Sequence, residues 1–285
     1  MAFTLGIGII TYNRRDIVAH TIDRVREFTC WPDAALVVAD DGSTDGTPEM
    51  LNEKQVGVVT GVNMGIAWNK NRALFLLAQI LRCDTMILLE DDAHPSRHGW
   101  ETDWIAATNR WGHINYAGDW LNESIESGAG TPEDPFLSLQ LTAQCAAYSR
   151  ASLAWGGYFH PRFKGWGHEH VEHSGRLVRA GFGGHEERTE SGKHVWYRSI
   201  AGHVTAVFCP THATAEKEAE NRRVAHEVME QPQYCAPWEN DEQRNRFRSE
   251  IESAMGAGSE WFRLTPPLSL TSPQDCGVFN RIRSA

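Results

Sequence analysis

A chain of 285 residues is long enough for one large α/β domain or two small ones. Hydrophobic residues make up 41% of it and charged residues 22%, which is the balance of a soluble globular protein rather than of a disordered one. The 37 acidic residues outnumber the 27 Lys and Arg residues, and the net charge of −10 argues against a protein that holds nucleic acid mainly through its phosphates.

The six cysteines are scattered and form no C-x-x-C pair, which argues against a zinc ribbon, a redox motif or a dense disulfide framework. The first residues lack the basic start and the cleavage site of a signal peptide. No run approaches the roughly 18 apolar residues that a membrane span needs. We therefore expect a cytoplasmic protein with no membrane span.

The first hundred residues alternate between two kinds of segment. Short apolar runs predict strands at 3–11, 34–39, 56–60 and 85–89. Helical periodicity predicts helices at 16–28, 44–53 and 69–82. Strands and helices that alternate at this spacing indicate a mainly parallel sheet covered on both faces.

The rest of the chain is less regular. A Gly-, Ser- and Pro-rich stretch at 124–135 predicts a flexible flap, residues 139–148 a strand, and residues 169–180 a helix. Charged helical segments follow at 213–231 and 240–254, and a Pro- and Ser-rich tail begins at 265.

Polar clusters follow three of the predicted strands, namely Thr11-Tyr12-Asn13, Asp40-Asp41 and Glu90-Asp91-Asp92. Parallel sheets bind ligands beyond the carboxyl ends of their strands. Three adjacent carboxylates with no basic residue next to them repel one another unless a cation neutralises them, and hard oxygen ligands suit Mg²⁺ or Mn²⁺. The alternative is a solvated acidic turn.

Five segments, in order and spacing, resemble family 2 glycosyltransferases of the GT-A fold: GIGIITYNRRD, VVADDGSTDGT, GVNMGIAWNKNRAL, MILLEDDAHP and QCAAYSRASLAWGGYFHPRFKGWGHEHVEHSGRLVRAGF. The last segment carries a galactosyltransferase-like G-W-G-x-E motif. The resemblance implies an α/β, Rossmann-like, mainly parallel sheet flanked by helices. It implies a glycosyltransferase domain over 1–212, with a nucleotide-binding half at about 1–95 and an acceptor half at about 96–212. A helical extension and tail would occupy 213–285.

The resemblance also implies where a nucleotide-sugar donor binds. The matching residues are Thr11, Tyr12, Asn13, Arg15, Asp40, Asp41, Asn63, Gly65, Asn71, Glu90 and Asp91. An aspartate that accepts a hydrogen bond from uracil N3–H would select that base, so UDP is the expected nucleotide. The aspartates could instead only form a turn and a helix cap.

The D-x-D element of the family binds the divalent ion that bridges the donor diphosphate. It matches Glu90-Asp91-Asp92, and Asp92 is the expected ligand of Mn²⁺ or Mg²⁺. A later histidine completes the metal site in many members. His203 is the candidate here, with His212 and His194 as the runners-up.

The catalytic base of the family follows a G-W-G-G-E-D type sequence, whereas this chain has Gly167-His168-Glu169-His170. Either Glu169 or His170 takes the proton, or the acceptor needs little deprotonation, and Glu169 is favoured because it matches a family acid in place. His170 could instead be a metal ligand or an acceptor contact. The nearby Glu169 and Glu172 are expected to raise the pKa of His170. A solvated helix start is the alternative.

An aromatic and glycine-rich patch precedes this base. Its members Trp155, Gly157, Trp166 and Gly167 are candidates for the sugar and acceptor pocket, because sugar C–H faces pack on aromatic rings. For each aromatic residue taken singly, a place in the hydrophobic core is the more common one.

We therefore predict a metal-dependent, inverting transfer of a hexose from a UDP-sugar to an acceptor hydroxyl. One alternative is glycosylation of a hydroxymethylated DNA base, with phosphates held by Arg222, Arg223, Arg244, Arg246 and Arg248. Another is a non-catalytic module that binds nucleotide sugars or glycans.

Overall fold

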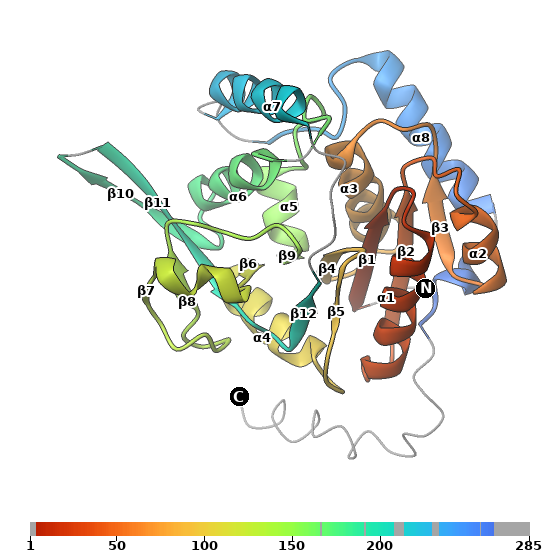
Figure 1. The fold of residues 1–285 in the computed structure, drawn as a ribbon, viewed down its shortest axis with the longest axis horizontal. Helices are drawn as coiled ribbons and strands as arrows, with labels where there is room; N and C mark the ends of the chain where they lie inside the picture. Colours follow the sequence, from red (N-terminus) through yellow and green to blue (C-terminus); the bar gives the residue numbers. More distant parts are fainter. Residues whose placement is uncertain are drawn as a thin grey trace.

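The computed structural model describes residues 4–165, 167–190, 192–207, 214–229, 234–256 and 258–264. Its main sheet has the strand order β3-β2-β1-β4-β9-β6-β11-β8-β7, with β10 paired to β11 (Figure 1). A separate two-stranded ribbon pairs β12 with β5. The predicted mainly parallel α/β sheet is thus confirmed.

Four parallel strands form the half of the sheet that begins the chain: β1 (Leu5–Thr11), β2 (Ala34–Asp40), β3 (Gly57–Thr60) and β4 (Thr85–Glu90). In the register of β1, Thr11 lies opposite Asp40 on one side and Ile10 opposite Glu90 on the other. All three predicted polar clusters therefore follow neighbouring strand ends at one edge of the sheet.

The other half of the sheet is mixed. Its strands are β6 (His113–Tyr116), β7 (Ile125–Ser127), β8 (Phe136–Ser138), β9 (Cys145–Ser149), β10 (Gly184–Thr189) and β11 (Gly192–Ile200), and the ribbon consists of β5 (Ala93–Pro95) and β12 (Val204–Ala206). The strand β9 runs antiparallel to both β4 and β6. This pairing attaches the second half of the sheet directly to the strand that ends in the acidic cluster.

Helices cover both faces of the sheet. They are α1 (Arg15–Phe28), α2 (Thr47–Glu53), α3 (Ile66–Phe75) with a π-helical turn (Leu76–Ile80), α4 (Glu101–Trp111), α5 (Arg150–Gly156), α6 (Glu169–Arg179), α7 (Ala215–Val228) and α8 (Asp241–Gly256), with 3₁₀ turns at Asp119–Ser124 and Ser259–Phe262. One core cluster contains apolar residues of α1, α2 and α4, and the other those of α3, α6, α7 and α8.

The C-terminal helix α8 packs into the core of the N-terminal half, whereas α7 contacts α6. Phe247 and Ile251 of α8 are buried in the same cluster as Trp68 of α3. Glu250 of α8 accepts hydrogen bonds from Trp68 Nε1 and from Arg72 Nε, each at 3.0 Å. The predicted helical extension is thus built onto the strand-end region. Among the described residues, no helix is both long enough and apolar enough to cross a bilayer.

Several sequence-based boundaries differ from the structure. The expected flap at 124–135 contains β7, which pairs with β8, so it is partly ordered by a strand. The strand expected at 139–148 is shorter and begins at Cys145. The helix expected at 69–82 begins earlier, because Gly65 with a φ of +94° precedes its first turn, and it closes through the π-helical turn. The tail from 265 lies outside the described residues.

A buried carboxylate at the start of α4 makes the stability of the fold depend on pH. Glu101 is fully buried, and its Oε1 accepts a hydrogen bond from Cys30 N at 2.9 Å, whereas its Oε2 has no partner in the described part of the chain. Burial raises the pKa of Glu101 to about 7, against an ordinary value of 4.5. Between these two pH values the folded state holds a proton that the unfolded state has lost.

We expect the free energy of unfolding to fall as pH rises through this window, and Glu101→Gln to remove that part of the dependence. Urea unfolding at pH 5, 6 and 7 measures it, and the stability of Glu101→Gln relative to wild type should increase with pH. Glu53→Gln, at an exposed position on α2, is the matched control. A stability difference between Glu101→Gln and wild type that stays constant with pH would contradict the assignment.

Candidate functional site

Asp91 fastens the turn that follows β4 to the end of β1 and to α1. Its Oδ2 accepts a hydrogen bond from Thr11 Oγ1 at 2.8 Å, its Oδ1 accepts one from Arg14 Nη1 at 2.9 Å, and its backbone oxygen accepts one from Thr21 Oγ1 at 2.5 Å. Burial raises the pKa of Asp91 to about 6, although Arg14 opposes the rise. This carboxylate is therefore a structural anchor of the site.

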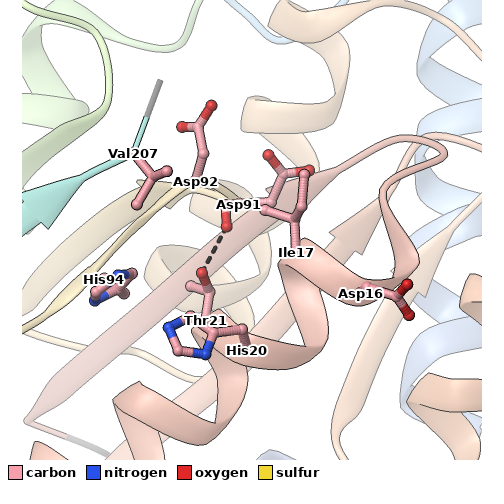
Figure 2. Close-up of a pocket in the computed structure, with 8 residues that line it drawn as sticks. All are labelled: Asp16, Ile17, His20, Thr21, Asp91, Asp92, His94 and Val207. Carbon is pink, nitrogen blue, oxygen red and sulfur yellow. Dashed lines mark hydrogen bonds between the residues drawn. The ribbon is translucent and has the colours of Figure 1, made fainter. Parts of the chain in front are cut away.

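Asp92 offers a carboxylate oxygen that the protein does not use. Its Oδ2 accepts a hydrogen bond from Arg14 Nη1 at 3.0 Å, whereas its Oδ1 is buried without a partner in the described part of the chain. Burial and then the charge of Glu90 raise the pKa of Asp92. Asp92 lines a pocket of about 260 Å³ together with His94 of β5 and Val207, and Figure 2 labels all three side chains. Such an oxygen suits a divalent cation.

A buried ammonium group joins the end of β4 to the start of α6. Lys70 lies on α3 with its side chain fully buried, and its Nζ donates to Glu90 Oε1 at 2.8 Å and to Glu169 Oε1 at 3.2 Å. It also contacts His170 Nε2. Because an ammonium can only donate, Nε2 accepts, and the ring proton of His170 is assigned to Nδ1.

We call Lys70, Glu90, Glu169 and His170 the Lys70 cluster. The charge states of its members depend on one another. Burial disfavours the charged forms of Lys70 and Glu90. The carboxylates of Glu90 and Glu169 nevertheless raise the pKa of Lys70, and the Lys70 ammonium lowers the pKa of Glu90 to about 2. Burial and then Lys70 lower the pKa of His170. At neutral pH the cluster therefore contains an ammonium, an ionised Glu90 and a neutral imidazole.

Burial and then Lys70 lower the pKa of His170, so the expected net rise is wrong, although Glu169 opposes the shift as expected. Glu172 does not face the imidazole as an isolated charge, because Arg176 Nε donates to its Oε1 at 2.8 Å. Lys70 approaches the imidazole more closely than Glu169, whose Oε1 lies 3.8 Å from Nε2. A buried ring beside an ammonium is held neutral.

Sequence reasoning missed the two cations of the site. The strand-end carboxylates do have basic partners, namely Lys70 for Glu90 and Arg14 for both aspartates. Neither partner is adjacent in sequence, since α1 and α3 deliver them. A signal was present for Lys70, because it lies on the helical face of Leu74 and Leu77, at spacings of four and seven residues.

The aspartates after β2 are occupied by the protein itself. Asp40 accepts hydrogen bonds from Ser43 N at 3.2 Å and from Thr60 Oγ1 at 3.0 Å. Asp41 accepts from the backbone N–H groups of Met64 and Gly65, at 3.0 and 2.8 Å, and from Arg72. Both carboxylates therefore shape the loop at this edge, which agrees with the alternative that they form a turn. Asp41 Oδ2 accepts one hydrogen bond, from Gly65 N, and a carboxylate oxygen can accept two.

Other expected donor residues divide into exposed and enclosed ones. Tyr12 is 39% exposed at the end of β1, and Arg15 and Asn63 are exposed as well. Asn13 connects the loop after β1 to the loop after β2, because its Oδ1 accepts a hydrogen bond from Thr44 N at 2.8 Å. Asn71 is fully buried, and its amide forms two hydrogen bonds with the backbone of Phe159, at 2.8 and 2.9 Å. The backbone of Gly65 packs against that of Lys164. A Cβ atom placed on Gly65 would lie only 2.4 Å from the backbone oxygen of Lys164.

The structure does not bring His203 to Asp92. Val207 N donates to Asp92 O at 2.8 Å, so His203 lies four residues away along the ribbon, or about 13 Å. Its Nε2 is 3.1 Å from Arg97 Nη1 and 3.5 Å from Asp103 Oδ2. Of the runners-up, His194 lies on β11, and His212 lies outside the described residues.

The expected acceptor patch is only partly assembled. Trp155 on α5 is 70% exposed. Gly157, at a φ of +75°, packs against the backbone of Cys235, where a Cβ would meet an oxygen at 2.2 Å. Gly167, at a φ of +99°, precedes the first turn of α6. Trp166 lies outside the described residues.

A divalent ion could be held by the cluster of Glu90, Glu169 and His170 or by Asp92. Glu90, Glu169 and His170 can bring ligand atoms within 4.8 Å of one another, but Lys70 Nζ contacts all three and already supplies a positive charge. Asp92 fits better, because its Oδ1 is a buried anionic oxygen without a partner in the described chain.

Comparison with known proteins bears on the sequence family and on the fold. Residues 7–127 match the family described as glycosyl transferase family 2. This segment ends before 165–169 and does not test the G-W-G-x-E motif. No curated protein matches the chain in sequence.

Two solved structures share the fold. One is the mannosyltransferase PcManGT from Pyrobaculum calidifontis in complex with GDP-Man and Mn²⁺, with a TM-score of 0.51 and 16% identity over 91% of this chain and 77% of that one. The other is GalNAc-T7 with UDP, GalNAc and Mn²⁺, with a TM-score of 0.54 and 13% identity over 90% of this chain and 56% of that one. The predicted GT-A fold is confirmed.

Removing the buried ammonium should destabilise the fold strongly. Lys70→Met leaves Glu90 and Glu169 without their cation, and we expect a loss of about 3–5 kcal/mol in the free energy of unfolding, measured with urea. Lys54→Met removes a partly exposed pair with Asp23 and should cost less than about 1 kcal/mol. Equal losses in the two variants would show that the Lys70 cluster does not need its cation.

Proposed function

We propose that this protein is a glycosyltransferase that moves a sugar from a nucleotide-sugar donor to an acceptor hydroxyl with the help of a divalent cation. The observation that carries the proposal is the unpartnered Oδ1 of Asp92 at the strand-end edge of a GT-A fold. The match of residues 7–127 to glycosyl transferase family 2 supports the same reaction.

Asp92 is the proposed ligand of Mn²⁺ or Mg²⁺, and both similar structures contain Mn²⁺. A bound divalent ion would offset the negative charge that develops on the departing diphosphate. Arg14 holds the other oxygen of Asp92 and fixes the direction of the free one. His203 remains part of the proposal only if the ribbon rearranges, because it lies at the other end of it.

The donor pocket is proposed to lie over the ends of β1 and β2. Tyr12 presents an exposed ring on which a base can stack. Uridine remains the proposed nucleotide, and guanosine is the competing choice because PcManGT was solved with GDP-Man. Transfer of a hexose with inversion is likewise part of the proposal.

Glu169 is the proposed base. Its Oε2 is buried without a partner in the described residues, whereas His170 directs Nε2 at Lys70 and has no free basic nitrogen. Glu169 is only 1% exposed, so acceptor binding must uncover this oxygen. That burial also favours one competing function, a module that binds nucleotide sugars without turning them over.

A saccharide hydroxyl is the proposed acceptor. The alternative of a modified DNA base loses its phosphate track, because most of the arginines invoked pair with acids of their own helix. These pairs are Arg222 with Glu218, Arg223 with Glu220 and Glu227, Arg244 with Asp241, and Arg246 with Glu242.

Nucleotide release from a panel of UDP- and GDP-sugars with Mn²⁺ tests the function. We expect turnover with a uridine donor that EDTA abolishes. Asp92→Asn should lower kcat/KM by at least about 100-fold, because several kcal/mol of transition-state stabilisation come from the ion. Asp23→Asn, an exposed aspartate of α1, should match wild type. Donor binding without release in the presence of acceptor extracts would favour the binding module.

The base is tested by Glu169→Gln and His170→Asn, each assayed for transfer and for donor binding by calorimetry. We expect Glu169→Gln to lose on the order of 10²-fold or more in kcat with donor affinity retained. The pKa of His170 is lowered from its ordinary value of 6.5. If protonation of His170 reduces the rate, the reduction should therefore occur below pH 6.5. An active Glu169→Gln beside an inactive His170→Asn would reverse the assignment.

A further inference from the structure

A second cavity lies at the end of the sheet opposite the candidate site. It has a volume of about 510 Å³, and the end of α4, the start of α5 and the link from α6 to β10 surround it. Ser149 on its wall lies opposite Thr85, the first residue of β4, whereas Glu90 is the last. Five residues of strand separate the two ends, or roughly 17 Å. The cavity is therefore separate from the proposed donor pocket.

Two arginines share one aromatic ring at this cavity. The guanidinium carbon of Arg198 lies 4.1 Å from the ring centroid of Trp111, and that of Arg110 lies 5.0 Å from it. Within the described part of the chain, neither guanidinium is within ion-pair distance of a carboxylate. Burial lowers the pKa of Arg198 with no anion to oppose it. The described part of the chain thus leaves this half-buried cation without a carboxylate partner.

Helix ends supply only part of the missing negative charge. The C-termini of α4 and α6 both approach this cavity, through Gly112 and Gly181. Each contributes about half of a negative elementary charge, so together they offset about one of the two guanidiniums. A net positive charge remains.

A buried hydroxyl on the same wall also lacks a partner. Thr108 is 1% exposed, and its Oγ1 has no hydrogen-bond partner in the described residues. A buried hydroxyl without a partner costs free energy, which a ligand that accepts its hydrogen bond would recover. Thr108 lies on α4, one turn before Trp111.

We propose that this cavity binds a small organic oxyanion, whose phosphate or carboxylate group contacts Arg198 and Arg110 and accepts a hydrogen bond from Thr108. A guanidinium pairs with such groups through two parallel hydrogen bonds. The volume lies within the range of small-molecule pockets, roughly 300–1,000 Å³, and exceeds what an inorganic ion fills. The ligand is therefore an anionic molecule of about monosaccharide size or larger.

Calorimetric titration of inorganic phosphate and of glucuronate into the full chain tests the proposal, with glucose as the neutral control. We expect at least one of the two anions to bind, and Arg198→Gln to weaken it at least tenfold. Arg24→Gln is the matched control, because Arg24 also lies over an aromatic ring, that of Phe28, but pairs with Glu27 at 2.9 Å. It should bind as wild type does. Phosphate binding alone would identify a phosphorylated ligand, and glucuronate binding alone a carboxylated one.

Thr108→Val removes the hydroxyl and keeps the volume, so it tests the site even where Arg198→Gln loosens the fold, and it should weaken anion binding several-fold. Anion binding that both variants leave unchanged would place the anion elsewhere and overturn the proposal. Glucose binding as tight as that of the anions would also overturn it.

Discussion

The Lys70 ammonium is the interaction on which the arrangement of the site depends. An isolated ammonium in the interior costs several kcal/mol, so the elements around it must deliver compensating anions. Glu90 arrives from β4 and Glu169 from α6, which belong to the nucleotide and acceptor halves expected from the sequence. The two halves are therefore held together by one ammonium that pairs with a carboxylate from each of them. The same charge keeps Glu90 ionised and His170 neutral.

A second buried cation repeats this principle on the outer side of α3. Arg72 is fully buried and pairs with Asp41 at 2.7 Å and with Glu250 at 3.0 Å. Asp41 in turn holds the backbone N–H groups of Met64 and Gly65. A C-terminal helix thus supports the loop at the proposed donor pocket, which gives the extension a structural role in the site.

The sequence predicted the parts of the site that follow from local pattern. Apolar runs that end in polar residues indicated the four parallel strands, and strand neighbourhood then placed Thr11, Asp40 and Glu90 at one edge. Partners contributed by distant elements could not be predicted in this way. Arg14 and Lys70 reach the acidic cluster only because α1 and α3 pack beside it. The spacing of these residues along the chain does not predict that contact. The place of His203 could not be predicted for the same reason, since a separation of 33 residues from His170 does not give the register of the ribbon on which His203 lies.

The Glu169 and His170 assignments show a further limit. Their chemistry was readable from residue type, but burial decides whether a proton acceptor meets a substrate, and burial depends on the whole fold. For Asp92 the sequence and the structure point the same way. Its position in the sequence suggested a metal ligand, and its Oδ1 has no partner in the described residues.

The most direct test of this account is an anomalous-scattering map from crystals grown with UDP and Mn²⁺. The account predicts one manganese peak bonded to Asp92 Oδ1 and to the diphosphate, with Lys70 still in contact with Glu90 and Glu169. A manganese peak between Glu90, Glu169 and His170, with Lys70 displaced, would contradict it.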